Sequence, residues 1–158
     1  MRTALLLLLC LSVAQPASAE RLDDSLSTQQ QFDLDLNWKQ QHNTDDLNDH
    51  EFNALTARAR HVEIRLNTAR FVGQRGKIFI RLPVNIRGTV DSTALRMSWE
   101  TNGLFSNGSV SAGNRAKLFE GEITEPVMSD VFDITFDIDA RQVYNNLRFQ
   151  PVFDIETF

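Results

Sequence analysis

The sequence predicts an all-β protein, an antiparallel β-sandwich of about seven or eight strands. Two observations predict this class. Apolar and polar residues alternate over many short stretches, and Gly, Asn and Pro residues separate these stretches at intervals of roughly eight to twelve residues. A jelly roll or a flattened barrel is the alternative arrangement for such a pattern.

The clearest strand is predicted over residues 131–139. Its apolar residues point to one side, because side chains alternate along a strand with period two. Such a strand requires a sheet beside it and a second layer over its apolar face. We therefore expect Phe132, Ile134, Phe136 and Ile138 in the core, and Asp133, Thr135, Asp137 and Asp139 on the wet face.

The N-terminal nineteen residues have the pattern of a secretory signal peptide. Arg2 precedes an apolar run, and the Ala17-Ser18-Ala19 site stands before Glu20. We expect cleavage after Ala19, a polar segment over 20–31 that is flexible or loosely docked, and one domain over 32–158. The predicted location is the periplasm or the exterior of a bacterium, because cleavage removes Cys10, the only cysteine, and leaves a domain without disulfides.

The first half of the domain contains two predicted strands around an ambiguous region. Residues 32–38 alternate and predict a strand, as do residues 62–66. Ala57 and Ala59 have the opposite parity to the second of these strands, which predicts a bulge or a strand start near Arg60. Between them, residues 44–58 predict either a short capped helix or an acidic loop that leads into a strand.

The second half contains four more predicted strands besides 131–139. They cover residues 77–86, 95–99, 116–124 and 147–155, with a turn over 73–76 and a loop over 88–92. On the strand at 77–86, the residues expected to face inward are Ile78, Ile80, Leu82 and Val84. On the strand at 95–99 they are Leu95, Met97 and Trp99, and on the strand at 147–155 they are Leu147, Phe149, Pro151, Phe153 and Ile155. Pro83 predicts an edge or a bulge, and Gly121 predicts a kink.

Charge is arranged in blocks along the chain. Residues 20–57 hold nine acids and two bases, residues 58–96 hold nine bases and two acids, and residues 97–158 hold ten acids and four bases. We favour pairing between basic and acidic strands, at about 0.2–1 kcal/mol per pair. The alternative is a basic face that binds an anionic envelope component, with Arg65, Arg81 and Arg87 as candidate binding residues and Phe79 as a candidate docking aromatic.

The aspartates Asp133, Asp137 and Asp139 are the candidate metal ligands, because carboxylate oxygens suit calcium. The sequence contains no calcium-binding loop, and no cofactor is expected. We predict no catalytic residues, since the expected mature chain has no cysteine and no G-x-S-x-G motif. A hydrolase would have to use Asp133, Asp137 or His61.

The predicted function is that of an exported, non-catalytic binding or assembly module that docks a protein or a cell-envelope component. A carbohydrate-binding module is one alternative. The other alternative is a fibre subunit that completes its sandwich by strand exchange, or an inhibitor of another exported protein. No nucleic-acid partner is expected, and the oligomeric state is left open.

Overall fold

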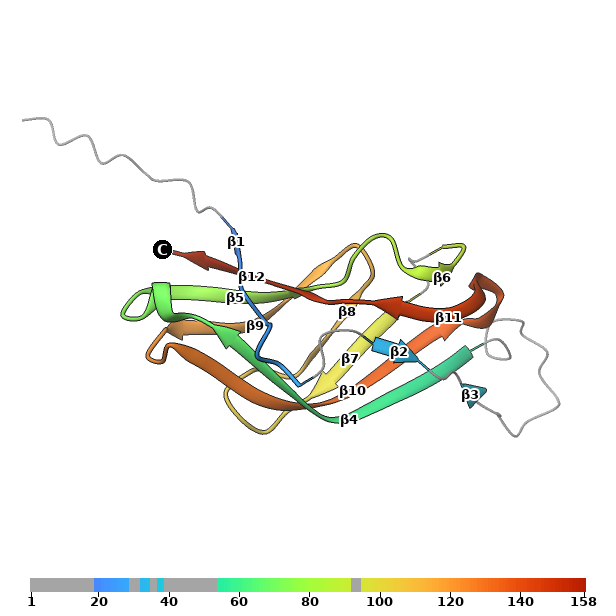
Figure 1. The fold of residues 1–158 in the computed structure, drawn as a ribbon, viewed down its shortest axis with the longest axis horizontal. Helices are drawn as coiled ribbons and strands as arrows, with labels where there is room; N and C mark the ends of the chain where they lie inside the picture. The colour runs from blue at the N-terminus through green and yellow to red at the C-terminus, as the bar shows by residue number, and fades with distance from the viewer. Residues whose placement is uncertain (1–18, 29–31, 35–36, 39–53, 92–94) are drawn as a thin grey trace, which may run out of the picture.

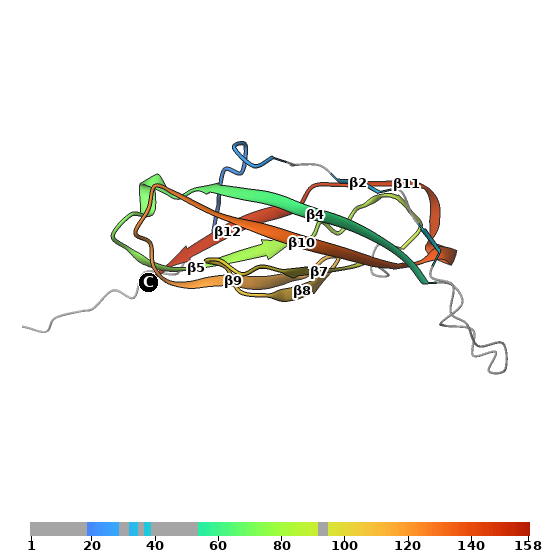
Figure 2. The same cartoon turned by 90° about the horizontal axis from the view of Figure 1, so that it is seen from below.

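A computed structural model of the protein describes residues 19–28, 32–34, 37–38, 54–91 and 95–158. Antiparallel sheets pack together without closing into a barrel, so the predicted sandwich is confirmed. The molecule is elongated, and most strands run along its long axis (Figures 1 and 2). None of the helical segments in the described part of the chain is long and apolar enough to cross a membrane.

One layer is a five-stranded sheet with β10 at its centre. Register between β10 and β4 extends over almost the whole length of both strands, from Val127 opposite Asn67 to Asp139 opposite Ala54. The sheet order is β3 (Asn37–Trp38), β4 (Ala54–Asn67), β10 (Val127–Asp139), β7 (Arg96–Glu100) and β8 (Gly108–Ser111).

The other layer consists of two sheets that continue one another. One has the order β1 (Glu20–Arg21), β12 (Val152–Thr157), β5 (Arg75–Arg81) and β9 (Arg115–Glu122); the other has the order β2 (Phe32–Leu34), β11 (Val143–Phe149) and β6 (Arg87–Thr89). Short 3₁₀ turns, η1 (Ala69–Phe71) and η3 (Ala140–Gln142), connect the layers.

Two prolines divide this second layer. Pro83 follows β5, and Pro151 lies between β11 and β12. Val152 pairs with Arg81, and Arg148 pairs with Arg87, so both prolines interrupt the layer at the same level. Proline has no N–H to donate to a ladder, which explains why β5 and β6, and likewise β11 and β12, are separate strands. These breaks contribute to a count of twelve strands in the described residues, above the predicted seven or eight.

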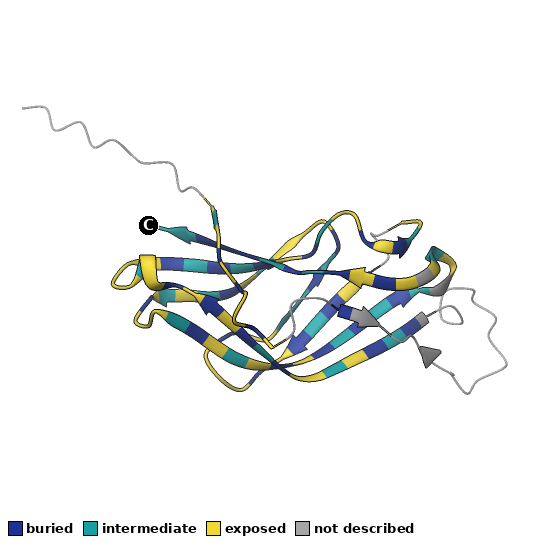
Figure 3. Cartoon of the chain, in the orientation of Figure 1, coloured by how far each residue is buried: buried dark blue, intermediate teal, exposed yellow. Residues whose placement is uncertain are grey.

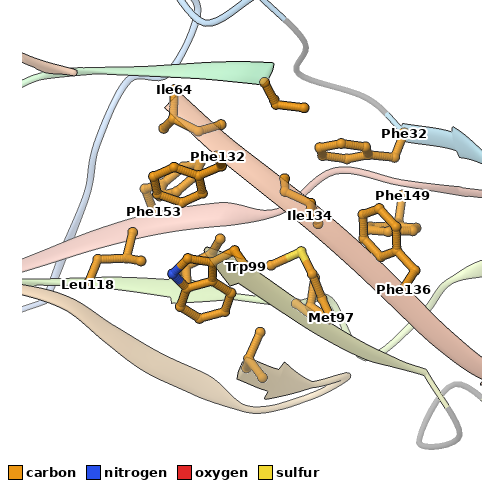
Figure 4. Packing of buried hydrophobic residues seen from close by; sticks show 14 of the residues in the cluster. Phe32, Ile64, Met97, Trp99, Leu118, Phe132, Ile134, Phe136, Phe149 and Phe153 are labelled. Atoms are coloured by element: carbon orange, nitrogen blue, oxygen red, sulfur yellow. The ribbon is translucent and has the colours of Figure 1, made fainter. Parts of the chain in front are cut away.

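The core is one apolar cluster between the layers (Figures 3 and 4). All the residues predicted to face inward on the strands at 77–86, 95–99, 131–139 and 147–155 are buried, except Val84. Val84 is 64% exposed, because β5 ends at Arg81 and the residues after Pro83 no longer alternate against the core. Phe105, which lies outside the predicted strands, is also buried and meets Phe132 edge-on at 5.9 Å.

Several predicted boundaries differ from the structure. The strand predicted over 32–38 is wrong as a single element, because β2 and β3 belong to different sheets. The predicted helix is wrong over 54–58, which begin β4, and its residues up to 53 lie outside the described part.

The loop predicted over 88–92 begins with strand β6. Instead of an irregularity at Gly121, which stays in register opposite Gly76, the register of β9 with β5 shifts at Leu118.

The bulge predicted near Arg60 is confirmed. The register between β4 and β10 steps from Val62 opposite Phe132 to Ala59 opposite Ile134, so Arg60 and His61 together lie opposite the single residue Asp133. The extra residue changes the parity of β4. As a result, Leu55 and Ala57 before the bulge and Val62 after it are all buried.

Candidate functional site

The bulge in β4 lies beside a pocket on the outer face of the five-stranded sheet. The pocket has a volume of about 590 Å³ and is bordered by β4, β10, β7 and the start of β8. Its polar lining includes Arg58, Arg60, His61, Glu100, Asn107 and Asp133, and Trp99 and Ile134 contribute apolar atoms. Trp99 is buried and its indole N–H donates to the Ser106 carbonyl at 2.8 Å, so its ring is part of the core.

His61 takes an unusual backbone conformation at this pocket. Its φ angle is 55°, and it is the only non-glycine residue of the described chain with a positive φ. The His61 N–H donates to the Asp133 carboxylate at 2.8 Å, which holds the bulge in place. Strained residues of this kind gather at functional sites, so the conformation marks the pocket as a candidate site.

The charges around the pocket are mixed. The His61 Nδ1 lies 4.0 Å from the Asp133 Oδ1, beyond hydrogen-bonding distance, and their side chains are 83% and 57% exposed. The structure therefore brings together two of the three groups predicted for a hydrolase. Asp137 lies elsewhere on the face and accepts a hydrogen bond from the Thr56 hydroxyl at 2.8 Å.

The three candidate metal ligands do not gather into one ligand group. Asp133 contacts His61, Asp137 contacts Thr56, and Asp139 binds the Arg141 guanidinium through a bidentate pair with distances of 3.0–3.1 Å and 2.6 Å. Over the described residues, no three His, Cys, Asp or Glu side chains are close enough together to hold a metal ion.

The four candidate binding residues are spread over three sheets. Arg65 is exposed on β4, Arg87 is exposed on β6, and Arg81 and Phe79 share the outer face of β5. Arg81 forms an ion pair with the nearly buried Asp154 at 3.1 Å. The structure therefore brings only Phe79 and Arg81 together.

Phe79 and Arg81 lie within a network of paired charges on the second layer. The Arg115 guanidinium covers the Phe79 ring at 4.2 Å and binds Glu156 at 2.5 Å. On the same layer, the hydrogen bond from the Lys117 ammonium holds the pKa of Glu120 below its usual value, with Lys77 as a further cation. The predicted pairing between the basic and the acidic blocks is therefore observed on this layer, where Arg81 pairs with Asp154 and Lys77 with Glu120.

The sandwich has a second candidate site at the edge of β11 and β12, where the N-terminal segment (residues 20–34) lies. β1 pairs antiparallel with β12, and β2 pairs antiparallel with β11. Leu22 and Phe32 are 2% and 1% exposed, so both side chains are fully part of the core. The Phe32 ring lies 5.2 Å from that of Phe136 and 5.7 Å from that of Phe149.

Between its two strands, the N-terminal segment also binds β4 in the opposite layer. The Asn67 N–H donates to the Asp23 carbonyl at 2.9 Å, and the Arg65 N–H donates to the Ser27 hydroxyl at 2.8 Å. The Thr28 N–H donates to the Glu63 carbonyl at 3.1 Å. The described part of the segment is thus docked against both layers and closes this side of the sandwich (Figure 1).

Sequence reasoning missed this docking because Leu22 stands alone in a polar stretch, with no alternation around it. The alternation at 32–38, which includes Phe32, predicted a strand and is the one signal in the segment that pointed to the site. Comparisons of the chain with protein-family models, with curated proteins and with solved structures found no match.

Proposed function

We propose that the protein is an exported, non-catalytic assembly module that docks an extended protein segment at the β11–β12 edge of its sandwich. The observation that carries the proposal is the way this edge is filled: a short segment supplies two buried side chains, Leu22 and Phe32, and adds a strand beside β12 and β11. Adding a strand to a sheet edge is a general mode of peptide recognition, in which backbone hydrogen bonds give affinity and side-chain pockets give specificity.

The edge has the properties that such docking requires. Without the N-terminal segment, β11 and β12 would present unpaired backbone groups, which pair readily with another chain. Phe136 and Phe149 would lose the ring that covers them, and an apolar opening would form beside the unpaired edge. A partner segment therefore needs an apolar residue at the Phe32 position and a second one at the Leu22 position.

The binding of a peptide with the sequence of residues 20–34 tests the proposal. In a Leu22→Ala/Phe32→Ala variant of residues 20–158, the chain's own segment docks weakly and leaves the edge open. We expect this variant to bind the fluorescent wild-type peptide, measured by anisotropy. A control peptide with Phe32→Ala is expected to bind at least about 100-fold more weakly, since a phenylalanine-to-alanine change at a buried position costs about 3–5 kcal/mol. Equal binding of the two peptides would refute the proposal.

The pocket at the β4 bulge supports a second candidate, a carbohydrate-binding module. Its guanidinium, carboxylate and amide groups at Arg60, Asp133 and Asn107 offer the donors and acceptors that orient a polar ligand. A glycan array probed with the wild-type protein and with an Arg60→Ala variant tests this candidate. Binding that is lost in the variant supports it, whereas Arg115→Ala, which lies outside the pocket, should leave binding unchanged.

A further inference from the structure

We propose that the segment docked at the β11–β12 edge is exchanged between copies of this chain, so that the N-terminal segment of one copy completes the sandwich of another. This inference rests on the proposed function and names its partner, a second copy. It follows from three features of the described chain: how the segment is held, how it is connected, and which contacts an exchange preserves.

The N-terminal segment is held by backbone bonds along its two sides and by two side chains in the core, Leu22 and Phe32. Within the second layer, β1 and β2 are terminal strands in the order of their sheets, so each has a neighbour on one side only. Its backbone bonds reach β12 through the Leu22 N–H and the Phe153 carbonyl at 2.8 Å, and β4 through Asp23 and Thr28. No strand of the described chain crosses over it, so it can leave without disturbing the central pairing of β4 with β10.

The connection to the body of the sandwich is long. Strand β3 lies on this connection and pairs with β4 through only two residue pairs, Asn37 opposite Thr56 and Trp38 opposite Leu55, so exchange would carry β3 along with the segment. Fifteen residues, 39–53, then separate β3 from β4 in the sequence. A chain of that length reaches at most roughly 50 Å, which allows the segment to meet the edge of a neighbouring molecule.

Exchange preserves every contact of the docked state. The same residues of the segment would meet the same edge, whether that edge belongs to their own chain or to another, which is the condition for segment swapping. Each copy carries both a segment and an edge, so it can give its segment to one neighbour and receive a segment from another. Intramolecular docking competes through an effective concentration on the order of millimolar, so exchange is favoured at high protein concentration.

Cysteine pairing tests the exchange, because the chain from residue 20 onward contains no cysteine. Asp33 and Arg148 are opposite one another in the β2–β11 register, at a separation suited to a disulfide. An Asp33→Cys chain and a size-tagged Arg148→Cys chain are unfolded, mixed, refolded together at high and at low concentration, and oxidised. The control mixture pairs Asp33→Cys with Glu122→Cys, an exposed position on β9.

We expect the Asp33→Cys/Arg148→Cys mixture to form at least about tenfold more mixed disulfide than the control, with a yield that falls on dilution, since exchange is intermolecular. Equal yields in the two mixtures would overturn the inference. A measurement without substitutions gives a second test: in a refolded mixture of isotope-labelled and unlabelled wild-type chains, NMR contacts between Phe32 of one chain and Phe149 of another indicate exchange, and contacts within single chains only argue against it.

These outcomes separate the inference from the proposed function. If the peptide of residues 20–34 binds the Leu22→Ala/Phe32→Ala variant but the full chains do not exchange, the edge is a docking site and its partner is another protein. If the peptide does not bind, the docking function itself is wrong.

Discussion

Replacing Phe32 by alanine should loosen the N-terminal segment more than the rest of the sandwich. Phe32 is 1% exposed, and its ring contacts those of Phe136 and Phe149, which also contact each other. Phenylalanine-to-alanine changes in cores cost about 3–5 kcal/mol, including the cavity that they leave. The cost to global stability cannot exceed the free energy with which the segment docks, because beyond that limit the segment detaches from a sandwich that stays folded.

Hydrogen exchange with a residue-level readout measures this difference. We expect the protection of the amides of residues 20–34 to fall by about 10²–10³-fold in Phe32→Ala, which corresponds to about 3–4 kcal/mol. The amides of β10 should keep more of their protection. The matched control is Phe136→Ala, which removes a ring from the same cluster at 0% exposure but from the central strand. This control should lower protection throughout the sandwich and shift the urea midpoint.

Two outcomes of the exchange measurement would contradict this prediction. If Phe32→Ala keeps the wild-type protection of residues 20–34, the ring does not anchor the segment. If both variants lower protection uniformly, the N-terminal segment unfolds only together with the whole sandwich, and it is an integral edge of the fold rather than a detachable one.

Three further predictions concern other parts of the molecule. Gly108→Ala should cost about 1–3 kcal/mol in urea unfolding, because a Cβ there would lie 2.8 Å from the buried Trp99 indole; an unchanged midpoint would contradict this packing. His61→Gly should raise stability by about 0.5–1 kcal/mol by relieving a positive φ of 55°, and a loss of stability would show that the imidazole outweighs the strain. By NMR titration, the pKa of Glu120 should lie below its ordinary value of 4.5 and should rise in Lys117→Gln. The stability that the ionised Glu120 contributes is present above pH 4.5 and is lost as the pH falls through the lowered pKa.

The interior of the fold could be predicted from the sequence because period two is a strong signal wherever one face is buried. The alternation of Phe132, Ile134 and Phe136 identified the central strand, and the change of parity before Val62 identified the bulge. The strand ends were harder to predict. Strand β5 ends at Arg81, two residues before Pro83, rather than continuing through a bulge. β5 has a neighbouring strand on each side, and proline has no N–H to donate to a ladder.

The candidate sites were less predictable because each depends on residues that are far apart in the sequence. Arg60 and Asp133 meet at the pocket only because β4 and β10 pair across some seventy residues, and no local pattern encodes that pairing. The Leu22 contact with the core has the same origin. A single leucine in a polar stretch carries no period, so its burial depends on the edge that β12 offers.

The pairing of charges on the second layer bears on how this sandwich could meet a partner. A basic face that attracts anions needs cations whose charge is not already compensated. On the second layer, Arg81 and Arg115 instead hold Asp154 and Glu156 of the C-terminal strand, so both cations are already paired. These pairs fix β12 beside β5 and leave its opposite side to the N-terminal segment. The arrangement therefore favours a partner that is recognised through backbone pairing and apolar side chains over one recognised by charge.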